Sequence, residues 1–98
     1  MLAARLNDLR AELSQRKGRK IPRHEIATRC EQVAIDMGIA AEDAPSAGAL
    51  QKMELLEGGT QSPSGVYLVL LAHVYGVSFL SLVVLTLPVE VRPWAERI

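Results

Sequence analysis

Apolar side chains recur every three or four residues in the first 37 positions, which is the spacing of one face of a helix. The first series is Leu2, Leu6, Leu9 and Leu13, and the second is Ile26, Cys30, Val33 and Met37. These series predict two amphipathic helices, over residues 2–15 and 22–37. Pro22 suits the first turn of the second helix, and Gly38 ends that helix.

A short third helix is predicted over residues 47–57. The segment before it, residues 39–45, holds two acids and a proline without periodicity, so we expect a connecting turn there. Ser46 can cap the third helix, because its side-chain oxygen can accept a hydrogen bond from a backbone amide of the first turn. Leu50 and Met53 are expected to point inward.

Two further helices are expected before the helical pattern ends. The segment 63–75 is apolar on nearly every side, which is typical of a helix at the centre of a bundle. Gly76 closes it, and Ser78 caps a short fifth helix over residues 79–84. Beyond it, apolar and polar residues alternate between two prolines, which predicts a short strand or extended tail at an edge. The alternating residues are Val89, Glu90, Val91 and Arg92.

The composition agrees with this helical pattern. At 98 residues the chain is long enough for one domain, which we place at residues 1–84, followed by a tail over residues 85–98. Hydrophobic residues make up 49% of the chain but aromatic ones only 4%, so Leu, Val, Ile and Ala must build the interior. An all-α, five-helix bundle is the predicted fold class.

Positive charge is concentrated where the first helix meets the second. Residues 1–29 carry eight Lys or Arg against three Asp or Glu, and residues 30–98 carry three against eight, so a formal charge of zero conceals a polarised molecule. The basic residues of the connection are Arg16, Lys17, Arg19, Lys20 and Arg23, with His24 beside them. A basic loop beside a helix N-terminus suits a nucleic-acid backbone. Five neutralised phosphates would give a log–log salt slope of about −4 to −5.

The sequence carries no pattern for catalysis, a metal or a cofactor. No glycine-rich phosphate loop or nucleophile elbow is present, and the acidic residues are dispersed, so we expect no enzyme. Cys30 is the only cysteine and is expected on an apolar helix face. His73 is expected to be partly buried and hydrogen-bonded, because no second ligand stands at metal-binding spacing. His24 is expected to be exposed at the helix start.

One segment is also compatible with a helix that spans a membrane. Residues 65–87 contain no charged side chain, and by length alone they could cross a bilayer. Gly76 and Ser78 lie near the middle, however, and no basic cluster flanks either end. No secretory signal is visible at the N-terminus, so the cytoplasm is the expected compartment.

Several motifs together resemble the helix-turn-helix regulators of the XRE or Cro/phage-repressor type. They are Leu50-Gln51-Lys52-Met53-Glu54, Gly58-Gly59, Ser62-Pro63-Ser64 and the run from Leu70 to the Gly76-Val77-Ser78 ending. The chain is also similar to the mycobacterial nucleoid-regulator variant, through its Ala3-Ala4-Arg5-Leu6-Asn7 opening and its lengthened second helix. The resemblance covers residues 2–83, with a longer second helix and a longer turn after it than the family usually has.

The resemblance implies a sequence-specific regulator of transcription that binds duplex DNA, acting as a repressor by occupying its operator. The exposed face of its major-groove helix would be Ser46, Ala47, Gly48, Gln51 and Lys52. Gln51 can pair with adenine, and Lys52 can meet either a guanine edge or a phosphate. Glu54 would support the turn without touching bases. A homodimer is expected, paired through the tail residues Leu87, Val89, Val91 and Trp94.

Two alternatives from other classes stay open. A protein-interaction module, antitoxin-like or an anti-repressor, would use the apolar tail to bind another chain and would have no affinity for DNA. A small membrane protein would sediment with lipid and need detergent for recovery. Trp94 is compatible with capping the core or with contacting a second copy.

Overall fold

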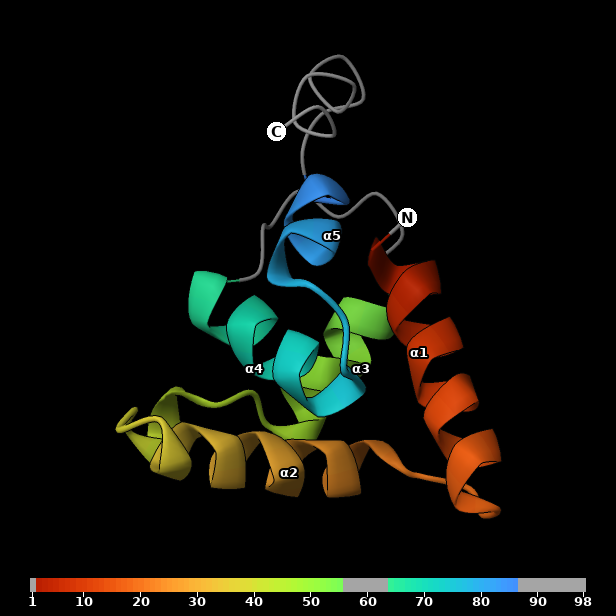
Figure 1. Cartoon of the computed structure of the whole chain (residues 1–98), viewed down its shortest axis with the longest axis horizontal. Helices are drawn as coiled ribbons and strands as arrows, with labels where there is room; N and C mark the ends of the chain where they lie inside the picture. The colour runs from red at the N-terminus through yellow and green to blue at the C-terminus, as the bar shows by residue number, and fades with distance from the viewer. Residues whose placement is uncertain (1, 56–63, 87–98) are drawn as a thin grey trace.

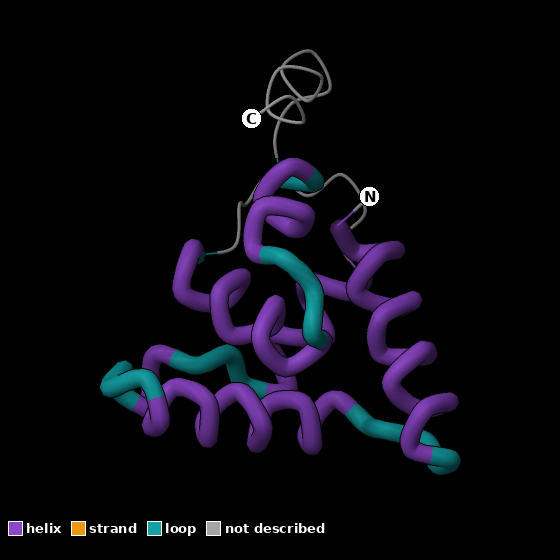
Figure 2. The backbone as a smooth tube through the Cα atoms, in the orientation of Figure 1, coloured by secondary structure: helices purple, strands orange, loops and turns teal. Residues whose placement is uncertain are grey.

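The computed structural model describes residues 2–55 and 64–86, and within them the chain is predominantly helical (Figure 1). Its elements in chain order are α1 (Leu2–Lys17), α2 (Arg23–Asp36), the 3-10 turn η1 (Ala41–Asp43), α3 (Ala47–Leu55), α4 (Gly65–Tyr75) and α5 (Phe79–Val84). Figure 2 shows no strand in these two segments. The predicted all-α class is therefore confirmed for the described residues.

Local sequence determines where the helices begin. Pro22 has φ −79° and ψ 164°, an extended conformation, so α2 starts one residue later than predicted. Ser64 Oγ accepts a hydrogen bond from Tyr67 N at 3.2 Å, and this cap starts α4 two residues later than predicted. Ser78 Oγ accepts from Ser81 N at 3.1 Å, which confirms Ser78 as the cap of α5.

The helix ends also follow the sequence closely. Gly38 and Gly76 have positive φ values of 76° and 70°, and they end α2 and α4 as predicted. The helix α1 continues to Lys17, two residues beyond its predicted end. The connection expected over residues 39–45 contains the 3-10 turn η1, which the absence of periodicity did not reveal.

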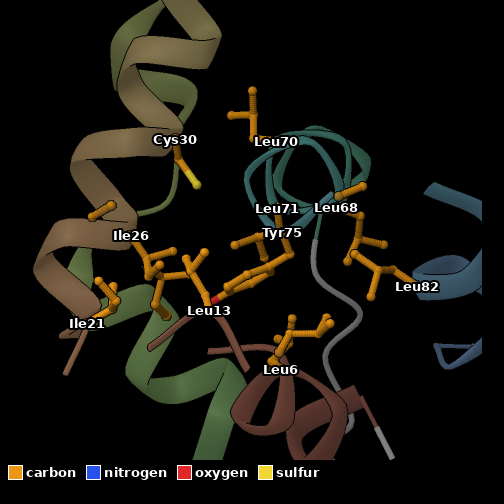
Figure 3. Close-up of a cluster of buried hydrophobic side chains, with 14 of the residues drawn as sticks. Leu6, Leu13, Ile21, Ile26, Cys30, Leu68, Leu70, Leu71, Tyr75 and Leu82 are labelled. Atoms are coloured by element: carbon orange, nitrogen blue, oxygen red, sulfur yellow. The ribbon is translucent and has the colours of Figure 1, made fainter. Parts of the chain in front are cut away.

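The helix α4 lies at the centre of the described fold, where it packs against α1, α2 and α5. In Figure 1, α1 stands along one side and α2 crosses beneath, with α3 and α4 in the angle between them. Side chains from α1, α2, α4 and α5 meet around Leu71 and Tyr75 (Figure 3). Cys30 is fully buried there, as predicted, and burial raises the pKa of its thiol to about 12.

Two residues expected inside lie at the surface. Met37 is 49% exposed because it is the C-terminal cap of α2, where the helical repeat no longer directs its side chain to the core. His73 is exposed, so its predicted partial burial is wrong. It lies two turns after Val66, which is also exposed, on the same side of α4.

The uncharged segment from residue 65 onward is divided between α4 and α5, with Gly76 between them. Within the described ranges, no helix has the length and apolar character needed to cross a membrane. Leu85 and Thr86 form a turn after α5, where Thr86 N donates to Val83 O at 2.9 Å. The predicted strand and the dimerisation residues Leu87, Val89, Val91 and Trp94 lie outside the described residues.

Candidate nucleic-acid interface

A buried carboxylate joins the first three helices. Glu54 on α3 is 5% exposed, and its oxygens lie 2.9 Å from Arg10 Nε and 2.8 Å from Arg23 Nε. Arg10 Nη1 also donates to the Ile21 carbonyl at 3.2 Å, and Asn7 Nδ2 donates to the Glu54 carbonyl at 3.0 Å. A buried charge needs such partners, and here they fix α1, the start of α2 and the end of α3 relative to one another.

The phenol of Tyr75 lies within the electrostatic influence of this cluster. Burial raises the pKa of Tyr75 well above its ordinary value, and the negative charge of Glu54 raises it further, while the positive charge of Arg10 lowers it. Tyr75 therefore stays neutral through the physiological range. The carboxylate of Glu54 is the negative charge that Arg10, Arg23 and Tyr75 surround.

Gly18 shapes the loop that carries the basic residues. Its φ of 69° is left-handed, and the Gly18 and Arg19 amides donate to the carbonyls of Gln15 and Ser14, each at 3.2 Å. Ser14 Oγ then accepts from Ile21 N at 2.9 Å, and Ile21 is fully buried. The loop between α1 and α2 is thus held against the end of α1.

The start of α2 and the start of α3 line one open hollow of about 540 Å³. We name it the α2–α3 hollow, and its lining residues are Arg10, Lys20, Pro22, Arg23, His24, Ala47, Gly48 and Gln51. Residues from two predicted groups, the basic loop and the third helix, therefore share one surface. No acidic residue lines the hollow, so its charge is positive.

The predicted base-reading residues lie at or beside this hollow. Ala47, Gly48 and Gln51 line it, and Gln51 is exposed. Ser46 is exposed and caps α3 as predicted, accepting a hydrogen bond from Ala49 N at 3.1 Å. Lys52 is exposed but does not line the hollow. These positions leave the polar side of α3 open to a ligand.

The predicted phosphate-binding residues divide among different surroundings. Lys20 and His24 are exposed and line the α2–α3 hollow, as does Arg23, which is also paired with Glu54. Arg16 and Lys17 instead line a separate hollow on the described surface. A continuous basic run in the sequence is therefore divided between two hollows in the fold.

Arg19 forms a salt bridge with Glu25. Its two terminal nitrogens lie 2.8 and 2.9 Å from the two oxygens of Glu25, and Arg29 Nη2 lies 3.0 Å from the same carboxylate. These hydrogen bonds, above all those from Arg19, hold the pKa of Glu25 at about 2. Two Arg19 donors therefore bind Glu25, and its positive charge is shared with that carboxylate.

The sequence pattern did not reveal the ion pairs of Arg10 and Glu25. Arg10 is a polar position between Leu9 and Leu13, and its series gave no sign that it reaches across to α3. Glu25 stands four residues before Arg29, a helical ion-pair spacing that is visible in the sequence. The partnership of Arg10 with Glu54 had no local signal, because 44 residues separate them.

No family model, curated protein or solved structure matches this chain.

Proposed function

We propose that this chain binds duplex DNA as a sequence-specific transcriptional regulator of the helix-turn-helix type, with α3 in the major groove. The observation that carries the proposal is the α2–α3 hollow, in which cations at the start of α2 adjoin the exposed start of α3. In this arrangement the cations position the protein on phosphates while α3 reads base edges. The chain would act by occupying its operator and blocking polymerase.

The dimensions and side chains of α3 suit this role. Its nine residues span about 13 Å at the rise of an α-helix, close to the width of the major groove, which is about 12 Å. Ala47 and Gly48 are small, so the start of α3 can approach a base pair closely. Gln51 follows one turn later, and its exposed amide can donate to and accept from an adenine edge.

The electrostatics suit a phosphate at the start of α2. The amides of a helix N-terminus favour anions, and Lys20 and His24 lie beside that terminus in the α2–α3 hollow. Arg23 also contributes to the positive potential of the hollow. Its pairing with Glu54 neutralises part of its charge, but 31% of its side chain is exposed. Dimerisation through the tail belongs to this proposal, since two α3 helices one turn of DNA apart would raise the affinity.

Replacement of Lys20 by Ala should weaken duplex binding by a similar factor on every sequence. With Lys20, Lys52 and Arg23 as the contacting cations, the wild-type salt slope should be about −2 to −3, and it should fall by about one in the variant. Binding isotherms at several salt concentrations measure both values. Arg5→Ala is the control, because it removes the same charge from a half-exposed residue outside the α2–α3 hollow.

Lys20 is a sharper test than its arginine neighbours. Replacement of Arg19 or Arg23 would also release Glu25 or Glu54, so a loss of binding would mix electrostatics with folding. Retention of full affinity and an unchanged slope in Lys20→Ala would contradict the proposed phosphate contact. Absence of salt-dependent binding to any duplex in the wild-type chain would overturn the proposed function itself.

Replacement of Gly48 by Ala should separate binding from folding. A Cβ at Gly48 meets only Ser46 Oγ, at 3.8 Å, so the fold accommodates it and gains up to about 0.5–1 kcal/mol in helix propensity. The added methyl should hold α3 away from the base pairs and weaken duplex binding by about 1 kcal/mol, or roughly fivefold. Thermal unfolding and binding isotherms together check the two opposite effects.

Gly65→Ala is the matched control for this variant. Gly65 is exposed in the first turn of α4, a Cβ there meets nothing within 4 Å, and it does not line the α2–α3 hollow. It should therefore leave duplex affinity unchanged. If Gly48→Ala also binds as tightly as the wild type, α3 does not approach DNA at this residue.

A further inference from the structure

We infer that a second hollow on this protein is a binding site for a phosphoryl group. We name it the basic hollow. It has a volume of about 300 Å³, and its lining residues are Leu13, Arg16, Lys17, Arg29, His73, Val74, Tyr75 and Gly76. It shares no residue with the α2–α3 hollow, so the inference goes beyond the proposed function and does not depend on it.

The basic hollow collects four basic side chains from three helices. Arg16 and Lys17 come from the end of α1, Arg29 from the middle of α2 and His73 from the last turn of α4. None of the lining residues is acidic. Cations gathered in this way repel one another, and a multiply charged anion would remove that repulsion.

Helix dipoles explain only part of this cluster. A cation in the last turn of a helix is stabilised by the nearby carbonyls, which accounts for Arg16 and Lys17 on α1 and for His73 on α4. Arg29 lies in the middle of α2, where the dipole has no such effect. Nor does the dipole require two helix ends to present their cations to one hollow.

Glu25 orients Arg29 but does not occupy all of its hydrogen-bond donors. Its Oε2 accepts from Arg29 Nε at 3.3 Å and from Nη2 at 3.0 Å, which fixes one edge of the guanidinium. The same carboxylate is shared with Arg19, and the remaining Arg29 donors are left for another acceptor. An oriented guanidinium loses less entropy on binding than a mobile one does.

The lining indicates a phosphoryl ligand. Guanidinium donors match the geometry of phosphate oxygens, and a lysine ammonium adds a point charge beside them. The volume of about 300 Å³ is at the lower end of the range for small-molecule sites. The phosphoryl group has two possible sources, a free polyphosphate or the backbone of bound DNA.

Titration of the full chain with inorganic pyrophosphate, followed by amide chemical shifts in NMR spectra, tests the inference. We expect saturable shifts at Lys17, Arg29 and Gly76, and none of comparable size at Gly65, which lines neither hollow. The double variant Lys17→Gln/His73→Gln should bind pyrophosphate at least about tenfold more weakly, because it removes the Lys17 cation and the imidazole donor of His73. All replaced side chains are exposed, so the fold should be retained.

The matched control is Arg5→Gln, which removes one positive charge at a residue that lines neither hollow. It should retain wild-type affinity for pyrophosphate. Equal weakening in the double variant and in the control, or no saturable shift in the wild type, would overturn the inference. Neither outcome depends on whether the chain binds duplex DNA.

A second titration, on protein saturated with its tightest duplex, distinguishes the sources. Retained pyrophosphate binding would indicate that the basic hollow takes a free polyphosphate. Competition by the duplex would indicate that the hollow takes a phosphate of the DNA backbone. Both results support a phosphoryl site at Arg16, Lys17, Arg29 and His73, provided that the first titration localises binding there.

Discussion

Replacement of Glu54 by Gln should lower the free energy of unfolding by about 3 kcal/mol. The glutamine keeps the shape of the side chain but removes the charge that Arg10 and Arg23 share, and its amide group presents donors to one of two guanidinium groups. Loss of one partner of a buried ion pair costs roughly 3–5 kcal/mol, and the lower end applies because both arginines reach solvent.

Thermal unfolding gives a direct measurement of this effect. In a domain of this size, about 3 kcal/mol corresponds to a fall in Tm of about 12–24 °C. The matched control is Glu12→Gln, which breaks the exposed pair between Arg5 and Glu12, with 57% of the Glu12 side chain exposed. That pair is worth less than about 1 kcal/mol. Equal changes in Tm for the two variants would contradict the anchoring role of Glu54.

Destabilisation by Glu54→Gln should also affect the candidate interface. Glu54 connects the start of α2 to α3, so its loss should disturb the relative position of Lys20 and Gln51 even where the fold persists. At a temperature where the variant is fully folded, we expect weaker duplex binding than in the wild type. Wild-type affinity in the folded variant would show that the ion pairs do not position the interface.

Replacement of Gln51 by Ala should remove discrimination at one base pair of the operator. On the proposed function, a bidentate contact from Gln51 to adenine contributes about 1–3 kcal/mol, or roughly 5- to 150-fold between the right base and the wrong one. The fold should be unaffected, since Gln51 is exposed and Ala is the best helix former. Selection from random duplexes, followed by competition with single-base variants, measures the change.

Lys52→Ala is the natural comparison, because Lys52 is the next residue on α3 but does not line the α2–α3 hollow. We expect it to weaken binding on all duplexes alike and to lower the salt slope by about one, as the loss of a phosphate contact does. A Gln51→Ala variant that loses affinity uniformly, with its base preference intact, would refute direct readout by Gln51.

Much of the helical pattern was predictable because its signals are local. The repeat of Leu6, Leu9 and Leu13 identified the buried face of α1, and Ser78 identified the start of α5. Such signals depend on hydrogen bonds and spacings within a few residues, and neighbouring elements do not change them. Met37 was misplaced because the predicted repeat ran into the C-terminal cap of α2, and His73 because its burial depends on how the other helices pack.

The candidate site was predictable only in part. The sequence pointed to a basic loop and to the polar side of α3, and Lys20, Gly48 and Gln51 do line one hollow. It gave no sign that Glu25 holds Arg19 or that Arg16 and Lys17 line a different hollow. A run of like charges in a sequence specifies its total charge but not the direction of each side chain.

The sequence by itself determined the helices, their caps and the polarity of charge, because each arises from hydrogen bonds and side-chain spacing within a few residues. Tertiary structure alone decided that Glu54 joins Arg10 to Arg23 and that His73 and Arg16 line one hollow. Contacts between residues far apart in the chain depend on how whole helices pack, and packing follows from the sum of the apolar faces rather than from any local pattern.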